Sequence, residues 1–110
     1  VQELSGGQQA AAGRVMAVVR ELAAAASEEY GGAVAGSRVV EVIEYQDCRG
    51  FLLAARQWLA AAAAADPAAA GPLAPMGQTI TAMLQVVPTA VPPSQVRATP
   101  AQMEALKARL

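Results

Sequence analysis

Hydrophobic positions along this chain recur mostly at the three- and four-residue intervals of an α-helix. Near the start the series is Val15, Val19, Leu22 and Ala26. This spacing predicts an amphipathic helix over residues 6–30. Ser5 and Gln8 have the spacing of a capping box at its start, and Gly31-Gly32 can end it.

A second helix is predicted from Ser37, as its N-cap, to Ala65, where the Asp66-Pro67 pair stops it. Its large apolar residues share one broad stripe, made of Val40, Ile43, Phe51, Ala54, Ala55, Trp58 and Ala62. We expect this stripe to supply the main volume of the core, with Trp58 at its centre. Residues 39–45 are rich in β-branched side chains and also fit a strand, although their periodicity favours the helix.

The second half of the chain is punctuated by prolines. Pro72 and Pro75 bracket a predicted connector, after which the spacing of apolar residues predicts a third, shorter helix over 76–87. Three further prolines predict an extended, semi-rigid strap over residues 88–98.

A final helix is expected over residues 99–110. It begins at a second capping box, formed by Thr99 and Gln102, with Pro100 at the first helical position. The chain is therefore predicted to be a single all-α domain spanning residues 1–110. The expected architecture is a small up-and-down bundle of three to four helices, with the proline-rich strap before the last one.

Composition makes the expected core thin and excludes several functions. Alanine supplies 28 of 110 residues and aromatic residues only four, so bulky side chains are scarce. Eight basic against nine acidic residues leave a net charge of −1, which argues against nucleic-acid binding. There is no histidine, and the only cysteine is Cys48, so Ser-His-Asp triads, Cys-His pairs and Cys/His zinc sites are excluded. We expect no enzyme activity, cofactor or metal site.

One polar cluster interrupts the predicted core stripe. Glu44 and Asp47 fall on the same helical face as Phe51 and Trp58, with Arg49 close by. Arginines, Arg49 among them, can satisfy the two acids between helices or at a partner. The alternative is a ligand binder or enzyme that uses Glu44 and Asp47 as a buried acidic pair.

Residues 57–96 carry a single charge, Asp66. A surface so poor in charge usually marks a protein interface. The candidate interface residues are Met76, Gln78, Met83, Val91, Pro92 and Pro93. The longest apolar run, residues 58–65, is far shorter than the ~20 residues of a membrane span. We therefore expect a docking protein that binds a larger complex, including a membrane-embedded one, without inserting into the bilayer itself.

The stretch Tyr45-x-Asp47-x-Arg49 followed by Phe51-Leu52-Leu53, together with the high alanine content, resembles the PsbQ-like four-helix proteins of photosystem II in green algae. This resemblance implies a non-catalytic factor of the chloroplast thylakoid lumen that assembles or stabilises photosystem II and binds no pigment or metal. It would place the chain in photosynthesis. The alternative is a small subunit of another organelle assembly or of a bacterial assembly.

Overall fold

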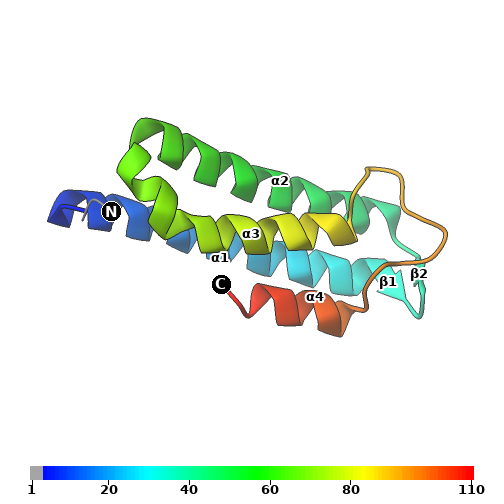
Figure 1. The fold of residues 1–110 in the computed structure, drawn as a ribbon. Coiled ribbons are helices and arrows are strands. Elements are labelled where there is room, and N and C mark those ends of the chain that lie inside the picture. Colours follow the sequence, from blue (N-terminus) through cyan, green and yellow to red (C-terminus); the bar gives the residue numbers. More distant parts are fainter. Residues whose placement is uncertain (1–3) are drawn as a thin grey trace.

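The computed structural model describes residues 4–110, which form an elongated bundle measuring 47 × 21 × 19 Å. The first three residues of the predicted domain lie outside the described part. The elements are α1 (Gly6–Ala33), β1 (Val34–Ala35), β2 (Arg38–Val39), α2 (Val42–Ala65), the short 3-10 helix η1 (Pro67–Ala69), α3 (Ala70–Val86) and α4 (Pro100–Lys107). Successive helices run in opposite directions, and α4 lies beside α1 and α3 (Figure 1). The prediction of an all-α up-and-down bundle is confirmed.

Both predicted capping boxes are present. The Gln8 amide donates to Ser5 Oγ at 3.1 Å, and the Ser5 amide donates to Gln8 Oε1 at 2.8 Å. Thr99 and Gln102 exchange the same two bonds at the start of α4. These bonds satisfy amides that have no partner within the helix, so each box fixes where its helix begins.

The connection between the two long helices differs from the prediction. Ser37 does not cap α2; it lies in a tight turn between β1 and β2, which pair Val34 with Val39 and Ala35 with Arg38. Gly36 has φ +62 and no other described residue has a positive φ, which fits a type II′ hairpin turn. The β-branched residues at the start of the 39–45 stretch favour the strand, and α2 begins only at Val42.

The core face of α2 is rotated from the predicted stripe. The buried residues of this helix are Tyr45, Cys48, Leu52, Ala55 and Leu59. By contrast, Val40, Ile43 and Trp58 are 56%, 72% and 48% exposed, so Trp58 is not the centre of the core. Because α2 carries apolar residues almost all round, periodicity alone does not fix which face is buried.

Alanine forms much of the buried face of α1, which packs on α2. On α1 the buried residues are Ala12, Val19, Ala23, Ala26, Ser27, Tyr30 and Ala33, so the predicted Val15 and Leu22 are only half-buried. Small side chains let two helix backbones approach closely, and the tyrosines of α1 and α2 supply volume at one end. One continuous core cluster extends from this contact to Met103 of α4.

Helix α3 starts earlier than predicted, because the two prolines belong to it. Asp66 ends α2 as expected, and its side chain accepts a hydrogen bond from the Ala68 amide at 3.2 Å to start η1. Pro72 lies in the first turn of α3, where an amide has no helical partner to lose. Pro75 removes one hydrogen bond from the second turn without ending the helix.

Candidate functional site

The hairpin end of the bundle gathers most of the buried polar groups. Tyr30 of α1 and Tyr45 of α2 are both fully buried, with their hydroxyls directed at the strap. Tyr30 Oη donates to the Ala98 carbonyl oxygen at 2.5 Å, and Tyr45 Oη donates to the Thr89 carbonyl oxygen at 3.0 Å. Burial raises the pKa of Tyr30 to about 12 and also raises the pKa of Tyr45. Both hydroxyls therefore stay protonated and act as hydrogen-bond donors.

The strap of residues 88–98 contains neither helix nor strand and crosses this end of the bundle (Figure 1). Bends along most of its length replace the extended path that we predicted. Its Val96 amide donates to the Ser37 carbonyl oxygen in the hairpin at 2.8 Å. Gln46 Nε2 donates to the Ala90 carbonyl oxygen at 3.2 Å, and Arg97 Nη1 donates to the Gln85 carbonyl oxygen at 3.3 Å. The strap thus lies on this chain's own helices.

Cys48 is enclosed beside the two tyrosines. Its side chain is fully buried, and burial raises the pKa of the thiol to about 12, with a smaller contribution from the nearby charge of Glu29. A thiol with this pKa is neutral at physiological pH and is a poor nucleophile. Cys48 serves as a small core residue.

The predicted polar cluster does not form a buried acidic pair. Asp47 is exposed, while Glu44 and Arg49 are half-buried. The Glu44 carboxylate lies against Gly32 at the end of α1, in space that a Cβ there would occupy. Within residues 4–110 the one ion pair joins Lys107 to Glu104, so no arginine pairs with Glu44 or Asp47 between the helices. The buried Arg49 Nε has no hydrogen-bond partner there either. Pairing of Glu44 or Asp47 with an arginine at a partner stays a prediction.

Glu29, Glu44 and Asp47 together form an acidic patch across α1 and α2. Partial burial raises the pKa of Glu29, and repulsion from Asp47, Glu44 and Glu28 raises it further. Across the described ranges, no three acidic or cysteine side chains are placed so that they could hold a metal ion. The patch is therefore a surface of mutual repulsion in this structure.

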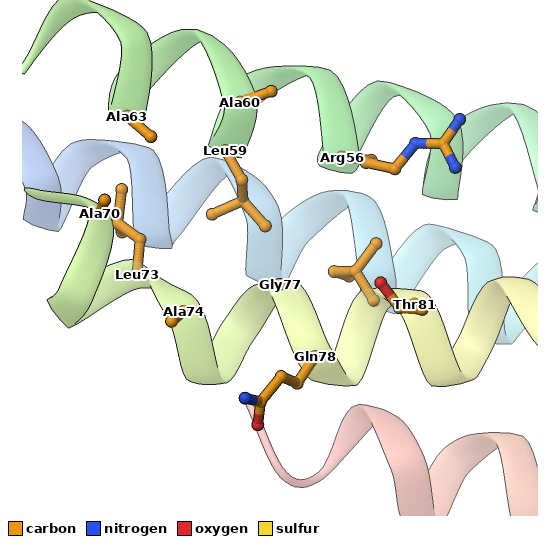
Figure 2. A pocket seen from close by; sticks show the side chains of 11 residues that line it. Arg56, Leu59, Ala60, Ala63, Ala70, Leu73, Ala74, Gly77, Gln78 and Thr81 are labelled. Carbon is orange, nitrogen blue, oxygen red and sulfur yellow. The ribbon is translucent and has the colours of Figure 1, made fainter. Parts of the chain in front are cut away.

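An open groove of about 550 Å³ runs between α2 and α3 (Figure 2). Its lining is dominated by alanine and leucine side chains such as Leu59, Ala63 and Leu73, with Arg56 and Thr81 toward one end. The groove lies in the charge-poor part of the sequence. It offers apolar contact and little else.

The candidate interface residues divide into two groups. Met76 and Met83 are 6% and 0% exposed, because they carry the core face of α3, so neither can line a surface in this fold. Gln78 and Val91 are exposed, and the adjacent Pro92 and Pro93 are half-buried. An interface formed by this second group stays a prediction.

Neither tyrosine was predicted to hold the strap, and Tyr45 was named only within the stretch that resembles PsbQ-like proteins. Their acceptors are backbone carbonyl oxygens 68 and 44 positions away, which no side-chain motif encodes. A usable signal was present nonetheless. Tyr45 falls in phase with Cys48 and Leu52, and a tyrosine on a buried face needs a partner for its hydroxyl.

None of the helices in the described part is both long and apolar enough to cross a membrane.

Comparison with known families gives one match. The family model for the "iron permease-associated 4-helix bundle domain" matches residues 5–110, which is nearly the whole chain. No curated protein and no solved structure matches. The description refers to a membrane transport system, which is compatible with the expected larger, membrane-embedded complex.

This match shows that the resemblance to PsbQ-like proteins was wrong. The roles that it implied in photosynthesis and in the assembly or stabilisation of photosystem II are therefore wrong as well. The predicted location in the chloroplast thylakoid lumen is also wrong. The resemblance depended on alanine-rich helices and a short stretch around Tyr45, Asp47 and Arg49. Structural needs account for Tyr45, which is buried and bonded to the strap, and Asp47 is simply exposed.

Proposed function

Because this chain belongs to the family of iron permease-associated 4-helix bundle domains, we propose that it serves iron transport as a helical domain working with a membrane-embedded permease. The observation that carries the proposal is the family match over residues 5–110. Those residues include all four helices and the strap, so the role belongs to the folded bundle as a unit. The permease and the bundle can be parts of one protein or of one complex.

The proposal concerns association with the permease and assigns the bundle no iron-holding centre of its own. In the part of the chain that the structure covers, the acidic residues do not converge on a common point, and the single thiol is buried. Iron is bound in proteins by carboxylate, imidazole or thiolate ligands, which must be brought together. Iron here is the transported substrate.

We also propose that the bundle catalyses no reaction. The Cys48 thiol is held neutral, and the carboxylates of the acidic patch lack the enclosed setting that tunes a general acid or base.

The test compares two aspartate substitutions on the same helix, made in the full protein in its native host. Ala23 is fully buried between helices, whereas Ala17 is exposed on α1. Ala23→Asp places a carboxylate in the core without a partner and is expected to unfold the bundle. Ala17→Asp adds the same charge and leaves the fold intact.

Uptake of radioactive iron, normalised to the amount of permease in the membrane, is the measurement. We expect Ala23→Asp to reduce iron uptake at least about fivefold and to leave manganese uptake unchanged, with Ala17→Asp behaving as the wild type. Unchanged iron uptake in cells whose Ala23→Asp bundle is shown by proteolysis to be unfolded would refute the proposed function.

A further inference from the structure

The C-terminal part of this bundle is attached by different contacts from those that hold its first three helices together. We call residues 88–110, the strap and α4, the latch, and residues 5–87 the three-helix body. Across the described residues, every side-chain hydrogen bond between positions more than ten apart has one partner in the latch. Helices α1, α2 and α3 pack on one another through apolar side chains.

The bonds that fasten α4 lie along α1. Ser27 Oγ donates to Glu104 Oε2 at 2.6 Å, and Arg20 Nε donates to the Leu110 carbonyl oxygen at 2.8 Å. Tyr30 adds its bond to Ala98 where the strap meets α4. A polar contact of this kind largely replaces a contact with water, so its net contribution to stability is small.

The apolar contacts of the latch are few. Met103 is its one fully enclosed side chain, while Val96, Ala98, Leu106 and Leu110 are only half-buried against the core. The body encloses the rest of the core, including Leu52, Ile80 and Met83. Hydrophobic stabilisation scales with the apolar area buried. The contacts between the latch and the body are therefore much weaker than the contacts among the three helices of the body.

The connection between these two parts lies outside any helix, and Val87 on the body side of it is itself fully buried. Helix α3 ends at Val86, and Val87 has φ −124 and ψ 63, outside the helical region. Pro88 follows, and a proline cannot extend the helix. The junction between body and latch therefore lies at residues 87–88.

We propose that the latch opens from the three-helix body as a unit while α1, α2 and α3 stay folded. Opening breaks the bonds of Ser27, Tyr30 and Tyr45 to the latch and uncovers the α1–α3 surface on which α4 lies. Partial openings of this kind are low-energy excursions of native proteins, and they include the elements held by the fewest buried contacts. The proposed opening of the latch does not depend on the proposed role in iron transport.

Hydrogen exchange followed by peptide-resolved mass spectrometry tests this in the intact protein. Amides of the latch, such as those of Val96 and Met103, are expected to exchange at least about ten times faster than amides of α2 around Leu52. Dilute urea should accelerate latch exchange less than exchange in α2. Opening exposes only the latch and the surface that it covers, whereas exchange in α2 requires the three-helix body to unfold.

Two matched variants separate latch opening from a general loss of stability. Tyr30→Phe removes one latch bond and is expected to accelerate latch exchange about fivefold without changing exchange in α2. Thr79→Val removes a bond within α3, from Thr79 Oγ1 to the Pro75 carbonyl oxygen, and should leave the latch unchanged.

Equal exchange rates in latch and body, with the same urea dependence, would show that the bundle opens only as a whole and would overturn the proposal. The same conclusion would follow if Tyr30→Phe accelerated exchange equally in both parts.

Discussion

Leu52 and Trp58 lie on the same helix but differ sharply in their surroundings. Leu52 is fully buried at the contact between α1 and α2, whereas Trp58 is 48% exposed. The cost of truncating a side chain depends on the contacts and the cavity left behind, so residue size alone does not rank these two positions. We therefore expect the larger residue, Trp58, to contribute less to stability than Leu52.

We predict that Leu52→Ala lowers the free energy of unfolding by about 2–5 kcal/mol, because the cavity is surrounded by fixed neighbours. Trp58→Ala should cost about 1 kcal/mol or less, close to the range of surface substitutions. Urea denaturation followed by circular dichroism measures both. A larger loss for Trp58→Ala than for Leu52→Ala would contradict the observed orientation of α2.

At the scale of elements, helix boundaries could be predicted wherever the sequence carries its own local signal. The capping boxes at Ser5 and Thr99 and the stop at Asp66 are local chemistry, and all three are present. The hairpin at residues 34–39 and the buried face of α2 were not predicted. Both depend on how α1 and α2 pack together, and an apolar helix of this kind leaves several packings open.

Glycines in different elements should respond oppositely to alanine. Gly50 lies exposed in the interior of α2, and a Cβ there would meet nothing within 4 Å. We predict that Gly50→Ala stabilises the bundle by about 0.5–1 kcal/mol, because alanine loses less conformational freedom on forming a helix. Thermal unfolding is the measurement. A lower melting temperature for Gly50→Ala would contradict the open surroundings of Gly50.

The matched change is Gly36→Ala in the hairpin turn. Gly36 has φ +62, where a Cβ approaches the following carbonyl oxygen. We expect this variant to lose about 1–2 kcal/mol. If alanine raised the stability to a similar extent at Gly36 and at Gly50, the turn would have to adopt another backbone conformation without cost.

At the scale of the whole molecule, the sequence predicted a helical bundle but not its role. The clue to function is distributed along residues 5–110 and is seen only by comparison with a family. Glu44 and Asp47 became candidates because they interrupt a stripe that proved to be the wrong face of α2, and Arg49 because it lies close to them in the sequence. The bonds that close the hairpin end use backbone carbonyl oxygens, so side-chain motifs could not reveal them.

Two glutamates are predicted to make the stability of the bundle depend on pH in opposite directions. The pKa of Glu29 is raised by partial burial and by its acidic neighbours. Ionised Glu29 therefore lowers the stability of the bundle above the raised pKa. This loss of stability disappears as pH falls through that pKa to the ordinary value of 4.5. The hydrogen bonds of Lys107 and Ser27 lower the pKa of Glu104. Its favourable contribution is present above 4.5 and is lost as pH falls through the lowered pKa.

Urea unfolding between pH 3 and pH 7 should separate these effects. Glu29→Gln is expected to stabilise the bundle at pH 7, with a smaller gain toward pH 4. Glu104→Gln is expected to destabilise it at pH 7, with a smaller loss of stability toward pH 3. Parallel pH profiles for the two variants would contradict the assigned surroundings.

The alanine-rich buried face of α1 also bears on how the two long helices are aligned. Its small side chains fix the position of the larger side chains of α2 only weakly along the helix axis, where one helical turn is about 5.4 Å. The two-residue turn at Gly36-Ser37 permits only a single offset, because the pairing of Val34 with Val39 ties the helix ends together. The short hairpin therefore sets the longitudinal alignment of α1 and α2, the two longest helices.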